Sequence, residues 1–187
     1  MMDFFAGYSY LRTNAAQGVN VPAGNLNGGL GSFSFNANEY IAGEAEFGFY
    51  HNNGQIDNTS ETYLFGPRLS LGRSKKFDPF IHVLFGGIHT GLKVSNASPL
   101  IPPHPVQPLP TPSNGSYSAS QANFAMVAGG GVDVHFTKHG YLRLAELDYL
   151  LTRFEAPNFL TPTGATSNRN QNNFRFSAGI GFDFGAR

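Results

Sequence analysis

The sequence predicts an all-β fold, in which a single domain of residues 1–187 forms an eight-stranded antiparallel up-and-down transmembrane β-barrel. Apolar residues alternate with small or polar residues in eight separate stretches, as in strands that have one apolar face. Only 13% of the residues are charged, yet the mean hydropathy of −0.21 is not that of a uniformly apolar chain. Short and long connections also alternate along the chain, which is typical of outer-membrane barrels.

The first four predicted strands cover residues 3–11, 30–37, 41–50 and 62–71. Large apolar residues of each stretch lie two residues apart, so they share one face of the strand. In the first stretch this face consists of Phe4, Ala6, Tyr8 and Tyr10. The opposite face of these stretches consists mainly of glycine, small polar residues and single charged residues.

The last four predicted strands cover residues 77–86, 123–136, 145–151 and 173–184, with the same period of two. The seventh strand has one irregularity. Extending its alternation backwards puts Arg143 on the apolar face. This position requires either a β-bulge or an interfacial site from which the long side chain reaches polar headgroups.

The connections predict which end of the barrel faces the cell exterior. Residues 37–40, 72–76 and 137–140 form short connections, whereas residues 13–28, 51–61, 91–122 and 152–172 form long loops. Outer-membrane barrels have short periplasmic turns and long extracellular loops. An even number of strands also puts both termini at the periplasmic end.

The size of the residues indicates which face of each strand points outward. The interior of an eight-stranded barrel has little room, so glycine and serine fit inside and large aromatic residues fit outside, against lipid. We expect ten phenylalanines to face lipid: Phe33, Phe35, Phe47, Phe49, Phe65, Phe85, Phe174, Phe176, Phe182 and Phe184. The alternative is a soluble lipocalin-like barrel whose aromatic face lines a cavity for an apolar ligand.

The same alternation puts charged residues in the lumen. The predicted lumen charge network consists of Glu44, Glu46, Arg68, Asp133, Glu146, Asp148, Arg175 and Asp183, with Asp3, His82 and His135 on the same face. Buried charges must pair, be hydrated or take up protons. We expect the arginines to bind carboxylates and plug the lumen. A narrow path that favours cations through an acidic lumen is the alternative.

Several function classes are disfavoured by composition. Twelve basic and twelve acidic residues leave no net charge to attract nucleic acid, and the absence of cysteine removes thiolate metal sites and Cys nucleophiles. No Gly-x-Ser-x-Gly motif and no metal-ligand motif is present. The pairs Glu44/Glu46 and Glu146/Asp148 could be catalytic carboxylates, but salt bridges in the lumen explain them more simply. We therefore expect no enzyme activity, no cofactor and no metal.

Several motifs resemble the OmpA-like small outer-membrane β-barrel family, in the version common among acidobacterial genomes. They are Phe5–Leu11, Tyr63–Arg68, Pro79–Gly87, Ala128–Val134, Leu147–Phe154 and Asn172–Ile180, in the order of that family and over nearly the whole chain. The resemblance implies insertion by the barrel-assembly machinery, which reads an aromatic final strand, here Phe182 and Phe184. Gly185, Ala186 and Arg187 depart from the family's usual aromatic end. The resemblance does not extend to a peptidoglycan-binding domain, so it does not imply a role in anchoring the cell wall.

These observations predict a protein of the bacterial outer membrane, with its signal peptide already removed, that has a structural or surface-interaction role. Its partners would be outer-membrane lipid, the barrel-assembly machinery and external molecules or other copies of the chain. The alternative is a subunit that assembles into an extracellular or surface polymer. The residues expected to mediate loop contacts are Leu100, Ile101, Val106, Leu109 and Tyr117.

Overall fold

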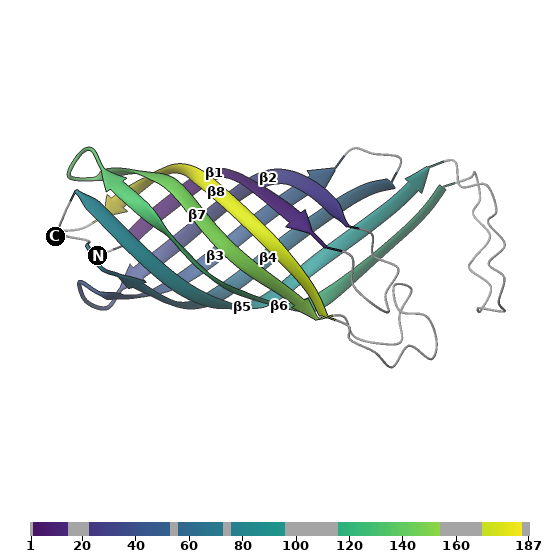
Figure 1. Ribbon diagram of the computed structural model, residues 1–187, viewed down its shortest axis with the longest axis horizontal. Helices are drawn as coiled ribbons and strands as arrows, with labels where there is room; N and C mark the ends of the chain where they lie inside the picture. The colour runs from purple at the N-terminus through teal and green to yellow at the C-terminus, as the bar shows by residue number, and fades with distance from the viewer. Residues whose placement is uncertain are drawn as a thin grey trace.

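A computed structural model describes residues 2–14, 23–52, 56–72, 76–95, 116–153 and 170–184. These residues form eight strands that close into a barrel (Figure 1). The strands are β1 (Met2–Thr13), β2 (Gly24–Asn36), β3 (Ile41–Asn52), β4 (Ile56–Ser70), β5 (Phe77–Ser95), β6 (Ser116–His135), β7 (Gly140–Arg153) and β8 (Asn170–Phe184). The described part of the chain contains no helix long and apolar enough to cross a membrane.

Each strand pairs in antiparallel fashion with its neighbours in the sequence, and β1 also pairs with β8 to close the barrel. The first residue of β1 and the last residue of β8 lie at one end, together with the turns at residues 37–40 and 136–139 (Figure 1). We call this the turn end and the opposite end the loop end. The predicted eight-stranded up-and-down barrel is thus confirmed.

The strands extend further toward the loop end than the sequence predicts. β2 begins at Gly24, β5 continues to Ser95 and β6 begins at Ser116, all inside ranges predicted as long loops. Only residues 53–55 separate β3 from β4, so the predicted loop 51–61 is mostly strand. The prediction is wrong here because it depends on the alternation of apolar and polar residues. Backbone hydrogen bonds between the strands continue toward the loop end after this alternation has stopped.

The outer face of the barrel is apolar. Its large apolar side chains are exposed by 37 to 64%. Nine of the ten phenylalanines predicted to face outward are among them, and Phe176 is half-buried on the same face. Whatever surrounds this barrel therefore meets an aromatic and aliphatic surface.

A β-bulge in β7 determines where Arg143 lies. The register of β7 shifts against β8 between Arg143 and Glu146, and against β6 between Val132 and Asp133. The extra residue leaves Leu142 and Leu144 exposed on the outside while Arg143 is buried inside. Of the two explanations offered by the sequence, the bulge is correct and the interfacial position of Arg143 is wrong.

Glycines on neighbouring strands make room for large aromatic side chains in the narrow interior. Tyr141 is paired with Gly181, and Phe80 is paired with Gly131. A Cβ atom at Gly181 would collide with the Tyr141 ring, and one at Gly131 would press against the Phe80 ring. These glycines are thus required by close packing inside the barrel.

Candidate functional site

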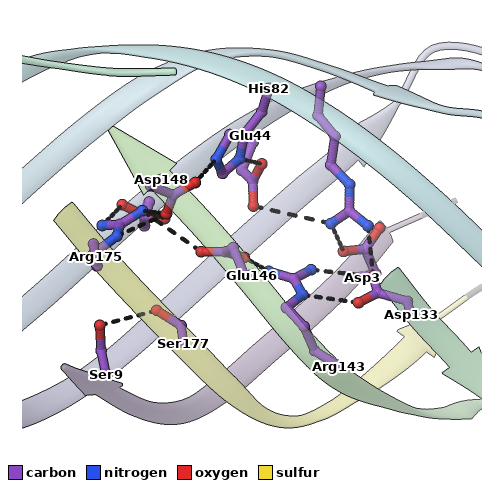
Figure 2. A network of polar contacts seen from close by, with 12 residues as sticks. Asp3, Ser9, Glu44, His82, Asp133, Arg143, Glu146, Asp148, Arg175 and Ser177 are labelled. Carbon is purple, nitrogen blue, oxygen red and sulfur yellow. Dashed lines mark hydrogen bonds and ion pairs between the residues drawn. The ribbon is translucent and has the colours of Figure 1, made fainter. Parts of the chain in front are cut away.

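The most distinctive chemistry of the molecule is a group of charged side chains buried inside the barrel (Figure 2). We call it the lumen network. It consists of Asp3, Glu44, Glu46, Arg68, His82, Asp133, Arg143, Glu146, Asp148 and Arg175, and each is at most 3% exposed. Strands β1, β3, β4, β5, β6, β7 and β8 contribute to it, so the closure of the barrel brings these residues together.

Arg175 lies at the loop side of the network and binds two carboxylates. Its Nη1 and Nη2 donate to the two oxygens of Glu46 at 2.5 and 2.8 Å. Its Nε and Nη2 donate to Asp148 Oδ2 at 2.8 and 2.6 Å. The contact with Glu46, in which two nitrogens meet two oxygens, is the strongest form of an arginine–carboxylate pair, and the two pairs together hold β8 against β3 and β7.

Arg143 and Arg68 share the carboxylate of Asp133 at the turn side of the network. Arg143 Nε lies 2.8 Å from Asp133 Oδ1, and Arg68 Nη2 lies 2.6 Å from Oδ2. Both guanidinium groups also stack on the ring of Phe80, at 3.9 Å for Arg68 and 4.4 Å for Arg143. Arg143 stacks on Phe5 as well, at 4.1 Å. Cation–π contacts of this kind compensate for part of the lost hydration of a buried charge.

His82 connects two acidic side chains of opposite strands. Its Nδ1 lies 3.0 Å from Glu44 Oε2 and its Nε2 lies 2.9 Å from Asp148 Oδ1. Both ring nitrogens are therefore saturated by carboxylates when the ring carries two protons. The sequence suggested His82 only as a further candidate, because its partners lie 38 and 66 residues away in the chain.

The network contains more acids than bases. Six carboxyl groups share three guanidinium groups and one imidazole, so acidic groups outnumber basic groups by two. Excess charge in a buried region must be balanced by protons, water or a cation. Arg143 is the one arginine of the network that the sequence did not predict to face the lumen.

Asp183, which was predicted as part of the network, lies at its turn side, where it is paired with Asp3 across β1 and β8. Its Oδ2 lies 3.3 Å from His135 Nε2, near the turn end. His139 Nδ1 lies 3.2 Å from the backbone oxygen of the same residue. The other seven predicted residues lie together in the lumen network.

An apolar layer fills the lumen on the loop side of the network. It consists of Leu11, Leu26, Tyr50, Leu64, Leu84, Ile88, Ala125, Val127 and Leu150, all buried. This layer was not predicted, because the inward face was expected to consist mainly of glycine, small polar and charged residues, and because Leu26 lies in a predicted loop. The sequence does indicate the layer, because leucines at the inward positions 64, 84 and 150 interrupt an otherwise polar face.

Of the residues predicted to mediate loop contacts, only Tyr117 belongs to the described residues. Leu100, Ile101, Val106 and Leu109 lie outside the described residues. Tyr117 belongs to β6, close to its first residue. This strand and β5 reach further at the loop end than the other strands (Figure 1).

The fold is similar to that of several solved outer-membrane proteins. Neisserial surface protein A has a TM-score of 0.65 at 10% identity, and the similarity covers 98% of this chain and 97% of that one. Ail of Yersinia pestis has a TM-score of 0.59 at 11% identity, covering 98% and 97%. OprG of Pseudomonas aeruginosa has a TM-score of 0.54 at 9% identity, covering 99% and 96%.

The chain has the fold of the small outer-membrane barrels of Gram-negative bacteria. At these identities the similarity concerns the fold alone. No protein-family model matches the sequence, and no curated protein is similar to it at a significant level. The resemblance to OmpA-like barrels is therefore supported at the level of fold, and the acidobacterial version stays a prediction.

Proposed function

We propose that this protein spans the bacterial outer membrane as a sealed barrel and presents its loops at the cell surface. The observation that carries the proposal is the distribution of side chains between the two faces. Large apolar residues cover the outside, while arginines, acids and serines are buried inside. A water-soluble barrel would have the opposite arrangement, because exposing so much apolar surface to water is unfavourable.

The height of the apolar surface supports a lipid environment. On β8, outward positions from Phe174 to Phe184 are apolar, and Asn172 follows toward the loop end. Ten residue steps correspond to ~33 Å along a strand. At a strand tilt of about 40° this is ~25 Å along the barrel axis, the usual height of the apolar band of outer-membrane barrels.

Polar outward residues mark the loop-end border of this band. Arg12, His51, Glu61 and Arg153 are all exposed there on four different strands. Just below them, outward tyrosines donate hydrogen bonds to asparagines: Tyr8 to Asn27, Tyr10 to Asn25 and Tyr149 to Asn172. Tyrosine is enriched at membrane–water interfaces, where its ring lies in the apolar region and its hydroxyl in the polar one.

Two layers support a sealed lumen rather than a cation path. The lumen network fills the middle of the barrel with paired charges, and the apolar layer follows toward the loop end. An ion that crossed the apolar layer would lose its hydration without finding polar groups, and this costs several kcal/mol or more. The narrow cation-favouring pore is therefore the less favoured alternative.

The loops are the proposed site of interaction with molecules outside the cell or with other copies of the chain. A barrel anchored in lipid keeps every connection at the loop end on the same side of the membrane. Insertion by the barrel-assembly machinery belongs to the same proposal, because β8 ends in the outward pair Phe182 and Phe184. Assembly into a surface polymer would use the same loops.

Electrophoresis of detergent-refolded protein with and without boiling tests the membrane assignment. We expect a shift in mobility on boiling, and precipitation when detergent is removed. Reconstituted into lipid vesicles that hold a potassium-sensitive dye, the protein should cause no leak above that of empty vesicles. A soluble, detergent-free monomer would contradict the membrane assignment, whereas a steady cation leak would contradict only the sealed lumen.

A further inference from the structure

We propose that His82, Glu146 and Asp148 form a binding site for a divalent transition-metal ion inside the barrel. One ligand atom from each residue lies within 4.8 Å of those of the other two, and all three side chains are buried. His82 belongs to β5, and Glu146 and Asp148 belong to β7. These strands are not neighbours in the barrel, so an ion at this point would link them across the lumen.

The orientation of His82 is suited to a metal ligand. Glu44 Oε2 lies 3.0 Å from Nδ1 and accepts the proton of that nitrogen. Nε2 then points toward Asp148 and Glu146 (Figure 2). A carboxylate that holds the far nitrogen of a histidine is the usual second layer of a metal site, because it fixes both the tautomer and the direction of the ring.

Asp148 and Glu146 each have one carboxylate oxygen to which no arginine of the lumen network donates a hydrogen bond, and this oxygen could bind the ion. Arg175 binds Asp148 only through Oδ2, while Oδ1 faces His82 Nε2. Arg143 binds Glu146 through Oε2. Glu146 Oε1 is buried and has no hydrogen-bond partner among the described residues, with Arg175 Nη2 at 3.5 Å as an ion-pair neighbour. Figure 2 shows this oxygen on the side of Asp148 and the other on the side of Arg143.

The charge of the lumen network supplies a reason for the ion to bind. Acidic groups outnumber basic groups by two in this buried region, so its carboxyl groups can all ionise only if further positive charge is supplied. A divalent cation would displace the proton that His82 Nε2 donates to Asp148, which is released to the solvent as the barrel folds, and would bind both atoms in its place. It would also supply positive charge beside the carboxylates that the three arginines share, where burial makes unbalanced charge costly.

The donor set indicates the class of ion. One imidazole nitrogen and two carboxylate oxygens suit Zn²⁺ or a neighbouring first-row metal better than Ca²⁺ or Mg²⁺, which prefer oxygen ligands alone. Three protein ligands leave a fourth position for water. Because the site lies behind the apolar layer, we expect the ion to enter while the barrel folds.

The test uses the full chain, refolded in detergent from metal-free buffer with Zn²⁺ present and then freed of excess metal. Elemental analysis should find about one Zn²⁺ per barrel, as expected for a single site. Glu146→Gln and His82→Gln should lower the affinity roughly tenfold or more, and Glu44→Gln, which loosens only the second layer, should do so by about 10- to 100-fold. The matched control Glu61→Gln replaces an exposed acid on the outer face, outside the lumen network, and should retain the ion.

Each variant is first checked for folding by its mobility shift on boiling. X-ray absorption of the wild-type protein with Zn²⁺ gives a second measurement that needs no variant, and it should reveal one imidazole nitrogen among oxygen ligands. Absence of bound Zn²⁺ in the folded wild-type barrel would overturn the proposal. So would a spectrum without an imidazole ligand, or Zn²⁺ retained by both folded ligand variants, since surface histidines would then hold the metal.

Discussion

Arg143 and Glu146 lie three residues apart in β7, yet both side chains point into the barrel and form an ion pair with Nη1 at 2.5 Å from Oε2. In a regular strand, residues three apart face opposite sides. The extra residue of the bulge removes this conflict and keeps Leu144 and Leu147 outside. The bulge thus adds a third arginine to the lumen network without turning any charge toward the outer face.

Deleting Ala145 should therefore be tolerated. The deletion restores strict alternation in β7, with Arg143 and Glu146 still inward and Leu144 and Leu147 still outward. The matched control is deletion of Ala178 in β8, a regular strand, where loss of one residue turns the following side chains to the wrong face. The fraction of protein that shifts on boiling measures folding. Equal losses for both deletions would contradict the role given to the bulge.

Replacing Arg143 should destabilise the barrel strongly. Arg143→Gln leaves Asp133 with Arg68 as its remaining arginine and removes the closest cation of Glu146. Removing one partner from a buried charge pair costs about 3–5 kcal/mol. Arg12→Gln, on the exposed outer face, should change stability by no more than about 0.5 kcal/mol. Urea unfolding in lipid vesicles compares the two, and similar midpoints would show that the lumen network contributes little.

The fold could be predicted from the sequence because the outer face is so uniformly apolar. Phe174, Phe182 and Phe184 belong to one such row in β8, and no polar residue interrupts the outward positions between them. In the proposed lipid-facing barrel a polar residue on the outer face is costly, so the alternation stays regular over the whole band. The pattern fades above that band, and this is why the predicted strands end too early.

The interior was harder to predict because it follows no single rule. Each interior side chain contacts residues on strands that are distant in the sequence. His82, for example, lies between Glu44 and Asp148. Their spacing in the sequence carries no signal of these contacts. The strict alternation of β7 put Arg143 on the apolar face because it assumes a constant register. One extra residue in the strand exchanges the inward and outward positions that precede it.

The outward phenylalanines lead to a prediction that separates a lipid-facing from a water-facing surface. Phe65→Arg, in the middle of the outward row of β4, should cost about 2–4 kcal/mol in a bilayer, whereas Phe77→Arg at the turn end should cost about 0–1 kcal/mol. Both side chains are exposed, at 50 and 57%. Equilibrium unfolding in vesicles measures both. Equal small effects would mean that the outer face does not contact the hydrocarbon core.

Packing in the lumen can be tested with two glycines that differ only in their surroundings. Gly181 lies against the Tyr141 ring, and a Cβ atom there would collide with it, whereas a Cβ atom at Gly43 would meet nothing within 4 Å. Gly181→Ala must push a buried aromatic ring out of place, which costs about 1–3 kcal/mol. Gly43→Ala adds a methyl group to the outer face of β3 without a clash and should leave stability unchanged or slightly higher, because alanine restricts the unfolded chain. Urea midpoints measured in the same vesicles compare the two variants directly. If Gly43→Ala lowered the midpoint as much as Gly181→Ala, the preference of the strand for glycine, and not the fit of Tyr141, would limit the residue at these positions.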